Sequence, residues 1–332
     1  MQDQHTTPQI SAIVCSRNNA RSLEATLRSL TQQQLPPSVN YEVLVVDNDS
    51  SDGTAEVAQR FVSANGAVFR YVMEKRLGLS FARNRGTADA RGEIVAFLDD
   101  DAVAHPDWLA QLWETYQKDP RAACVGGKVE LRFPPHPLPV WYDARLDGFL
   151  SARDLPYLEA KSERDFPHGT NISFRRSTLR QVGGFHPLLG ARRIGNIKLQ
   201  GDETQLCLRL LRAGMPVIFQ PAACVVHVVE DRRLRKGYFL GLAMANGYVR
   251  VILDNNGAIG VSTFGQLCQY AKRWFRRWLK YRFAAPTLSP SERFWTKVTV
   301  RMGWGSVWYC LVAKHQLRRL TRELTKSLGL QY

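Results

Sequence analysis

The sequence predicts an α/β protein whose central, mostly parallel sheet is flanked by helices and followed by a helical, basic C-terminal region. Two observations support this prediction. Over the first hundred residues, short apolar runs alternate with helical patterns, and the charge balance changes abruptly near residue 230. Apolar runs bounded by turn residues and separated by helices are typical of βαβ units, in which both faces of a parallel sheet are covered.

The alternation of elements can be followed along the first hundred residues. Strands are expected at four apolar runs, which are Ile10–Cys15, Tyr41–Val46, Val68–Val72 and Ile94–Leu98. Helical patterns lie between them, first through Leu23, Leu27 and Leu30 and then over Thr54–Val62 and Phe81–Ala90. Polar clusters follow the first, second and fourth strands. Ligands of such sheets bind beyond the carboxyl ends of the strands, so these clusters predict a shared site.

The middle of the chain, about residues 120–230, is less regular. Phe133–Pro139 holds four prolines and is expected to be a loop or an edge crossing, because proline lacks a backbone donor. Phe166–Phe174 and Gly183–Gly195 are rich in glycine and are expected to be loops over the site. A helix is expected at Glu203–Arg212, and a further strand within Val217–Val229.

The charge distribution divides the chain into two regions with different roles. Residues 1–230 hold 26 Lys/Arg and 26 Asp/Glu, whereas residues 231–332 hold 19 and four, so the whole net charge of +15 lies in the last part. We expect one domain over residues 1–230, in two parts at about 8–120 and 121–230. Residues 231–332 form the basic, Trp-rich helical region.

The cysteines and the apolar runs predict a cellular location. The six cysteines are scattered without metal-ligand spacing, which fits a reducing cytoplasm. The polar residues 1–9 do not resemble a signal peptide, and no apolar run approaches the length of a membrane-spanning helix. We therefore expect a cytoplasmic protein, and the aromatic and basic residues of the C-terminal region, described below, favour a peripheral place at the inner face of the cell membrane.

Three consecutive aspartates, Asp99, Asp100 and Asp101, end the fourth expected strand. Three carboxylates in a row repel one another unless a cation neutralises them, and oxygen ligands suit Mg²⁺ or Mn²⁺. The alternative is a solvated turn that caps the helix expected after Pro106.

Six motifs in order resemble the family 2 glycosyltransferases of the GT-A fold. They are Cys15 to Asn19 after the first strand, Asp47 to Thr54 after the second, Gly78 to Gly86 at a helix start, Phe97 to Asp101, Gly183-Gly184-Phe185, and Gly201 to Leu206. The resemblance covers about residues 8–230, and it implies that residues 1–230 are a catalytic domain with a nucleotide-sugar half at about 8–120 and an acceptor half at about 121–230. It implies a nucleotide-binding, Rossmann-like sheet and transfer of a sugar from a nucleoside-diphosphate sugar.

The resemblance implies a set of residues around the nucleotide sugar. Asp101 is the expected direct metal ligand, with Asp99 as a further candidate. Asp99 or Asp100 is expected to contact the ribose or to support the ligands, and His227 to reach the metal or diphosphate. Asp47 is expected to bind the nucleobase or ribose, and Ser16 and Arg17 are expected to flank the nucleotide. The phosphates are assigned to Arg83 and Asn84, at a helix start whose dipole favours anions. Turn capping by Asp47, a surface salt bridge of Arg83 and a core position of His227 are the structural alternatives.

Displacement at the anomeric carbon needs a base that takes the proton of the acceptor hydroxyl. The resembling family uses the second acid of a Glu-Asp pair, and here the order is reversed, as Asp202-Glu203. Glu203 is the base by position and Asp202 the fallback, although an acidic pair also suits any helix N-terminus. The resemblance implies inversion, and it places an acceptor pocket at His168, Asn171 and Phe185, of which Phe185 also suits ordinary packing.

The basic C-terminal region holds five of the eight tryptophans. Trp274, Trp278 and Tyr281 share one face of the helix expected at Lys272–Phe283, with Lys and Arg around them. Aromatic and basic residues in this arrangement are typical of helices on anionic lipid. A helix packed on the catalytic domain is the alternative. Nucleic acid is also bound by such residues, but it is not an expected partner because the sugar-transfer motifs leave no need for it.

The sequence thus predicts a metal-dependent, inverting, hexosyltransferase-type enzyme that makes single transfers in cell-surface polysaccharide biosynthesis. The acceptor is expected to be a glycan or a lipid-linked hydroxyl. A UDP-sugar is the first expectation for the donor, because such donors are the commonest in the resembling family. The alternatives are a non-catalytic nucleotide- or glycan-binding scaffold and a nucleotidyltransferase. The second alternative would need a Gly-rich phosphate loop after the first strand, where Ser16 to Asn19 stand instead.

Overall fold

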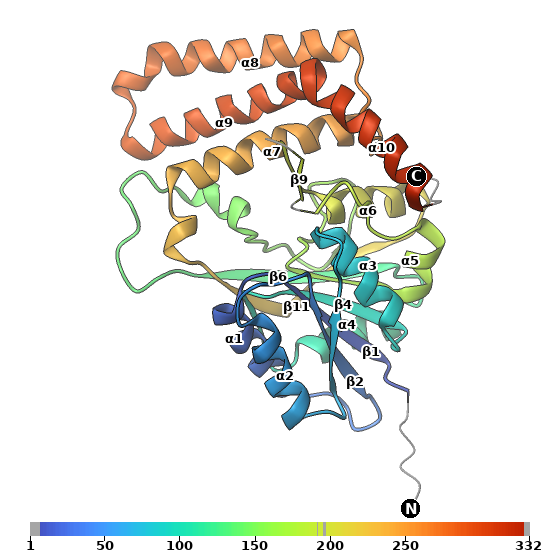
Figure 1. The fold of residues 1–332 in the computed structure, drawn as a ribbon. Coiled ribbons are helices and arrows are strands. Elements are labelled where there is room, and N and C mark those ends of the chain that lie inside the picture. Colours follow the sequence, from blue (N-terminus) through green and yellow to red (C-terminus); the bar gives the residue numbers. More distant parts are fainter. Residues whose placement is uncertain (1–6, 191, 195–196, 329–332) are drawn as a thin grey trace, which may run out of the picture. The chain divides into compact units, whose positions relative to one another are not determined.

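The structure is a computed structural model that describes residues 7–190, 192–194 and 197–328. It divides into two compact units that interleave along the chain (Figure 1). Unit 1 comprises residues 1–132, 151–187 and 206–228, and unit 2 comprises residues 133–150, 188–205 and 229–332. Each unit is described by itself.

Unit 1 is built on one mixed sheet with the strand order β3-β2-β1-β4-β8-β6-β11-β5, and β7 pairs with β11. The first four strands of this order are mutually parallel, while β8 runs antiparallel to both β4 and β6. The strands are β1 (Ile10–Ser16), β2 (Tyr41–Asp47), β3 (Phe69–Met73), β4 (Ile94–Asp99), β5 (Ala102–Ala104), β6 (Cys124–Arg132), β7 (Leu158–Glu159), β8 (Asn171–Arg175) and β11 (Val217–Val228). The predicted α/β class with a mostly parallel sheet is confirmed.

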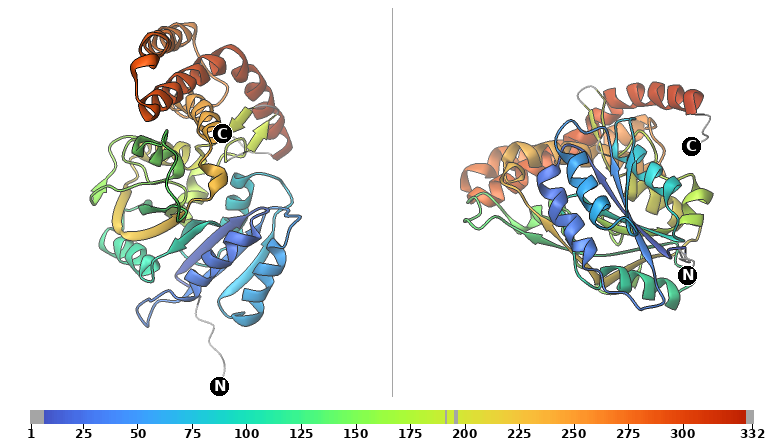
Figure 2. Two further views of the ribbon diagram at one scale, coloured as in Figure 1. Left: turned by 90° about the vertical axis from the view of Figure 1, so that its left-hand side faces the viewer. Right: turned by 60° about the horizontal axis from the view of Figure 1, so that its bottom comes forward.

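Helices cover the sheet of unit 1 in layers, because alternate residues of a strand point to opposite faces. Val14 of β1 belongs to a core that also holds residues of α1 (Ala20–Thr31), α2 (Thr54–Ala64) and α4 (Trp108–Lys118). Figure 2 shows α1 and α2 side by side. The other face of β1 lies against α3 (Leu79–Asp89), where a Cβ on Gly86 would meet Ile13 at 2.6 Å.

The expected elements of the first hundred residues are confirmed to within two residues at most ends. The expectation of a loop at Phe166–Phe174 is wrong over its second half, because Asn171–Arg175 forms the central strand β8. Four of its five residues are buried, because the strand pairs with β4 on one side and with β6 on the other. Helices α5 (Arg176–Val182) and α6 (Asp202–Arg212) follow it in the chain.

Unit 2 is mainly helical. It contains the 3₁₀ turn η1 (Ala144–Leu150), the hairpin β9 (Arg192–Ile194) and β10 (Ile197–Leu199), and helices α7 (Lys236–Asp254), α8 (Phe264–Ala284), α9 (Pro290–Trp308) and α10 (Lys314–Leu328). Helices α7 and α9 approach closely, since a Cβ on Gly247 would lie 2.2 Å from the carbonyl oxygen of Met302. A capping box at Thr263 begins α8, and another at Ser289 begins α9.

The expected domain division and aromatic stripe both need correction. The predicted boundary at residue 230 lies close to the end of unit 1, but residues 133–150 and 188–205 group with the C-terminal helices. Trp274 does not share an outward stripe with Trp278, because it packs in a core cluster with its ring centroid 5.0 Å from that of Trp304. Among the residues that the structure describes, no helix has both the length and the apolar character to cross a bilayer.

Candidate active site

Strand register brings the predicted polar clusters together at one edge of the unit 1 sheet. Ser16 pairs with Asp47 across β1 and β2, and Cys15 pairs with Asp99 across β1 and β4. The Ser16 hydroxyl donates a hydrogen bond of 2.6 Å to Oδ2 of Asp100. The three clusters that follow separate strands therefore form one acidic site.

Asp47 is held at the end of β2 by two donors. The Tyr71 hydroxyl donates to its Oδ2 at 2.8 Å, and the backbone N–H of Ser50 donates to its Oδ1 at 2.9 Å. Burial first, and then this carboxylate, raises the pKa of Tyr71 to about 12, so the hydroxyl stays a donor. Sequence reasoning missed Tyr71. The signal was its place in β3, where it pairs with Val45 and so shares a face with Asp47.

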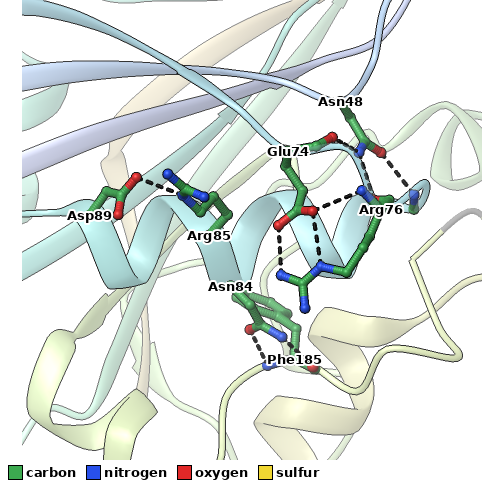
Figure 3. A network of polar contacts seen from close by, with 8 residues as sticks. Asn48, Glu74, Arg76, Asn84, Arg85, Asp89 and Phe185 are labelled. Atoms are coloured by element: carbon green, nitrogen blue, oxygen red, sulfur yellow. Dashed lines mark hydrogen bonds and ion pairs between the residues drawn. The ribbon is translucent and has the colours of Figure 1, made fainter. Parts of the chain in front are cut away.

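Asn48, the next residue, fixes the loop that leads into α3 (Figure 3). Its Nδ2 donates to the carbonyl oxygens of Glu74 and Arg76, both at 2.8 Å, and its Oδ1 accepts from the N–H of Gly78 at 2.8 Å. Glu74 and Arg76 add an ion pair of 2.7 Å within the loop. Gly78 has φ 137, a value that side-chain-bearing residues rarely adopt, so the glycine is required at this helix start.

The Asp99 carboxylate is held on both of its oxygens. Arg83 lies 3.5 Å from Oδ1, and the Thr170 hydroxyl donates to Oδ2 at 2.7 Å. Arg83 is buried, and it also donates to the carbonyl oxygen of Gly169 at 3.0 Å. Its guanidinium lies over the ring of Phe185 at 5.3 Å. The Arg83 side chain therefore orients the acidic cluster, and the expected phosphate contact stays a prediction.

Gly169 and Thr170 contact Arg83 and Asp99, and the sequence did not single them out. A Cβ on Gly169 would lie 2.7 Å from the Arg83 guanidinium, so a larger residue would displace it. Both residues immediately precede β8, the strand that had been expected to be a loop.

The third aspartate lies against the predicted histidine. Nε2 of His227 on β11 is 3.3 Å from Oδ1 of Asp101, and both side chains are buried. Register supports this contact, because His227 pairs with Ala102 of β5. Burial and then the adjacent Asp101 carboxylate raise the pKa of Asp100 to about 7. Three adjacent carboxylates, of which Asp101 is buried and the other two are partly exposed, favour a cation, which would relieve their repulsion.

The acidic pair begins α6, as the sequence predicted. Gly201, at φ 85, precedes Asp202, and the carbonyl oxygen of Gly201 accepts a hydrogen bond from the N–H of Gln205 at 2.9 Å. Asp202 is buried and Glu203 is half-buried. The division between the units falls within this helix, after Gln205. Two carboxylates in the first turn are stabilised by the helix dipole, whichever of them acts in catalysis.

The residues expected in an acceptor pocket are placed differently. The buried Asn171 amide accepts from Trp108 Nε1 at 2.8 Å and donates to the carbonyl oxygens of Lys128 and Ala223 at 2.9 and 2.7 Å. Phe185 is fully buried and packs edge-on against Phe97. These two residues serve the core, which corrects the expectation. His168 is half-buried, and burial followed by the Arg153 charge lowers its pKa to about 4.

Arg17 and Asn84 are the other two residues that the sequence assigned to the nucleotide. Arg17 follows β1 and is exposed at the same edge as Ser16. The Asn84 amide donates to the carbonyl oxygen of Phe185 at 2.8 Å and accepts from its N–H at 2.9 Å (Figure 3). Asn84 thus ties α3 to the Gly-Gly-Phe segment, and this backbone contact accounts for its side chain without a nucleotide.

Comparison with known proteins decides the family. Residues 11–183, slightly more than half of the chain, match the model of glycosyl transferase family 2. The chain belongs to this family. Membership makes it a glycosyltransferase, and the matched range contains the strands and loops that carry Ser16, Asp47, Arg83 and Asp99–Asp101.

Individual relatives and one solved structure agree with this placement. The glucosyl-dolichyl phosphate glucuronosyltransferase of Haloferax volcanii is 28% identical over 258 residues, which cover 74% of this chain and 77% of that protein. The succinoglycan biosynthesis protein ExoM of Rhizobium meliloti is 31% identical over 212 residues, 64% of each chain. The mannosyltransferase PcManGT of Pyrobaculum calidifontis, solved with GDP-Man and Mn²⁺, has a TM-score of 0.60 at 21% identity, covering 91% of this chain and 87% of its own. The last comparison establishes the GT-A fold.

Proposed function

We propose that this family 2 glycosyltransferase is metal-dependent and inverting, and that it transfers a sugar from a nucleoside-diphosphate sugar to a hydroxyl of a glycan or lipid-linked acceptor. The observation that carries the proposal is the cluster of Asp99, Asp100, Asp101 and His227 at one edge of the sheet, beside Ser16 and Asp47. A diphosphate leaving group needs neutralisation, and this cluster supplies the ligands for a cation.

The donor set fits Mg²⁺ or Mn²⁺. Both ions prefer carboxylate oxygens, and Mn²⁺ also accepts an imidazole nitrogen. Asp101 and His227 are 3.3 Å apart and present one oxygen and one nitrogen, with Asp99 as a further candidate ligand. When bound, the cation would act as a Lewis acid that stabilises the departing diphosphate.

The residues of the chain itself have distinct proposed roles toward the donor. Asp47, oriented by hydrogen bonds from the Tyr71 hydroxyl and the Ser50 N–H, accepts hydrogen bonds from the nucleobase or ribose. Ser16 and Arg17 flank the nucleotide, and Asp100 contacts the ribose through its place beside Ser16. Arg83 and Thr170 hold Asp99 in a fixed orientation, so that the acidic cluster is organised before the donor arrives.

The proposed base is Glu203, with Asp202 as the alternative. It would accept the proton of the acceptor hydroxyl as that oxygen attacks the anomeric carbon, while the bond to the diphosphate breaks. A single displacement without a covalent intermediate inverts the configuration of the anomeric centre. The place of both carboxylates in the first turn of α6 supports this assignment, because a helix N-terminus is a favourable position for negative charge.

An amphiphilic acceptor is supported by the surface of α8 and by one relative. Phe264, Phe275, Trp278 and Phe283 are exposed on this helix, and the rings of Phe275 and Trp278 stack with centroids 5.8 Å apart. Exposed Lys and Arg residues surround them, namely Lys272, Arg273, Arg276, Arg277 and Lys280. We propose that α8 rests on an anionic lipid surface at the inner face of the cell membrane. The name of the Haloferax volcanii relative specifies a dolichyl phosphate acceptor.

The proposed pathway is cell-surface polysaccharide or glycolipid synthesis, which the names of the two relatives suggest. The nucleobase of the sugar donor is to be identified by experiment, with uridine, guanosine and thymidine diphosphates as the first probes.

A thermal-shift screen of these nucleoside diphosphates, each with and without Mn²⁺ or Mg²⁺, tests the proposal. A ligand that binds only the native state raises the melting temperature by mass action. We expect one nucleotide to stabilise the protein, and only when the cation is present. Equal stabilisation without the cation would contradict metal dependence. The lack of any response in a folded sample would favour the non-catalytic scaffold.

A further inference from the structure

A second group of potential metal ligands lies in unit 1, apart from the aspartate cluster. His105 follows β5, Glu130 is on β6 and Cys224 is on β11. One ligand atom of each, namely a ring nitrogen, a carboxylate oxygen and the thiol sulfur, lies within 4.8 Å of both others. No two of these residues are near in sequence, so the fold assembles the group.

Backbone contacts bring the three positions together. The N–H of His105 donates to the carbonyl oxygen of Cys224 at 3.1 Å. Glu130 pairs with Val226 across the parallel strands β6 and β11, and Ala104 pairs with Val225 across β5 and β11. His105 and Glu130 therefore start from or next to paired residues, while Cys224 lies at the point where the register of β11 with β6 shifts, between Gln220 and Val225.

The surroundings of the thiol favour a cation. Cys224 is almost fully buried, and burial followed by the Glu130 charge raises the pKa of its thiol to about 11. Asp154 and Asp107 act in the same direction, and Lys128 opposes them. Lys128 forms ion pairs with Glu130 at 3.0 Å and Asp154 at 3.2 Å. Carboxylates thus outnumber the single Lys beside this sulfur.

The distances are compatible with zinc. Tetrahedral Zn²⁺ binds nitrogen, oxygen and sulfur at about 2.0–2.3 Å, which corresponds to ligand atoms roughly 3.3–3.8 Å apart. The present limit of 4.8 Å requires a closure of about 1 Å. His105 and Glu130 are only half-buried and can supply this movement by rotating their side chains.

We propose that His105, Glu130 and Cys224 form a binding site for Zn²⁺ that is separate from the aspartate cluster. A thiolate, an imidazole and a carboxylate are a ligand set that selects zinc over Mg²⁺, and three protein ligands leave a fourth position for water. Binding replaces the thiol proton of Cys224, which passes to the solvent, by a sulfur–zinc bond. Lys128 keeps its ion pair with Asp154 when Glu130 turns toward the metal.

The site has a structural consequence for catalysis. Zinc would tie together β6, β11 and the turn between β5 and α4. Cys224 lies three residues before His227 on β11, and β5 directly follows Asp101. The metal would stabilise the two strands that bring Asp101 and His227 into contact.

Cobalt titration of the full-length protein, after removal of metals with a chelator, tests the site. Co²⁺ replaces zinc and gives an intense near-ultraviolet charge-transfer band only when a thiolate coordinates it. We expect this band at one equivalent of Co²⁺, its loss on addition of Zn²⁺, and a rise in melting temperature with Zn²⁺ in the absence of any nucleotide.

Variants assign the band to these residues. Cys224→Ser should abolish it, and His105→Gln should abolish or strongly weaken it, while far-ultraviolet circular dichroism without metal stays unchanged. Cys268→Ser, which removes the exposed cysteine of α8, and Asp101→Ala should keep it. If Cys224→Ser fails to fold, the loss or persistence of the band in His105→Gln decides whether the site exists. The absence of a thiolate band in the native protein, or its persistence in the His105 and Cys224 variants, would overturn the proposal.

Discussion

The carboxylate of Asp101 and the imidazole of His227 lie 3.3 Å apart although 126 positions separate them in the sequence, and both side chains are buried. The contact exists because β11 runs antiparallel to the short strand β5. The backbone repeats it, since the N–H of Val228 donates to the carbonyl oxygen of Asp101 at 2.9 Å. An acidic residue and a histidine fixed in this way are the pair that we propose as metal ligands.

Thr170 is expected to act as a positioning residue for Asp99. Thr170→Val removes the 2.7 Å hydrogen bond to the carboxylate while keeping the shape of the side chain. We expect kcat to fall by about ten- to a hundredfold, because one charge-assisted hydrogen bond is worth about 1.5–3 kcal/mol. Steady-state kinetics over a series of Mn²⁺ concentrations measure the effect. Thr170→Ser, which retains the hydroxyl, should restore most of the rate; an equal loss in both variants would rule out the hydrogen bond as the cause.

The acidic pair of α6 should divide into a base and a supporting residue. Glu203→Gln is expected to lower kcat by about 10²–10⁴-fold and to leave nucleotide binding intact, because a general base acts only in the chemical step. Asp202→Asn should lower kcat by a smaller factor. Glu114→Gln, an exposed carboxylate on α4, serves as the control. If Asp202→Asn has the larger effect on kcat, the assignments of the two carboxylates are exchanged.

The exposed aromatic residues of α8 should control attachment to lipid. A Phe275→Ser/Trp278→Ser variant is expected to lose co-sedimentation with vesicles that contain anionic lipid, and binding of the native protein should weaken as salt is raised. Val140→Ser, which removes an exposed apolar side chain outside α8, is the matched control. Unchanged vesicle binding by the α8 variant would contradict the proposal that α8 binds anionic lipid. Binding of the native protein that depends neither on salt nor on lipid charge would contradict it as well.

Buried His186 should make the stability depend on pH. Burial, followed by the charge of Arg209, lowers its pKa to about 4, whereas the ordinary value is 6.5. Between these values the unfolded chain takes up a proton that the native state does not, so stability falls as pH decreases from 6.5 to 4 and this contribution levels off below 4. The slope is at most about 1.4 kcal/mol per pH unit for one histidine.

Urea unfolding at several pH values between 4 and 7 measures this effect. His186→Gln should make the dependence on pH shallower, and His315→Gln should leave it unchanged because that side chain is exposed to solvent. The comparison uses slopes rather than absolute stabilities, since His186→Gln also alters packing. Identical slopes in the native protein and His186→Gln would refute the role of this histidine.

The part of the site that the sequence predicted is the part that follows directly from parallel strands. Ser16, Asp47 and Asp99 each stand at or next to the carboxyl end of a buried apolar run, and such ends must meet at one edge. The contact of Asp101 with His227 was not predicted, since the pairing of β5 with β11 leaves no local pattern. The family resemblance implied only that His227 reaches the metal or the diphosphate.

The residues that sequence reasoning missed or misplaced depend on tertiary contacts. Tyr71 and Thr170 act by donating hydrogen bonds to Asp47 and Asp99 across the sheet, which no spacing in the chain reveals. Asn171 was assigned to an acceptor pocket because of its motif position, yet β8 carries it into the core. The interleaving of the two units was missed for the same reason, since composition changes only near residue 230.

Calorimetric titration with the nucleoside diphosphate that the screen selects tests the central claim, which is that the aspartate cluster holds a cation needed by the donor. The titration is made with Mn²⁺, with a chelator, and with Asp101→Ala in the presence of Mn²⁺. We predict that affinity falls by at least about a hundredfold in the last two cases, because the diphosphate loses its counter-charge. Equal affinity under all three conditions, in protein that remains folded, would contradict the claim.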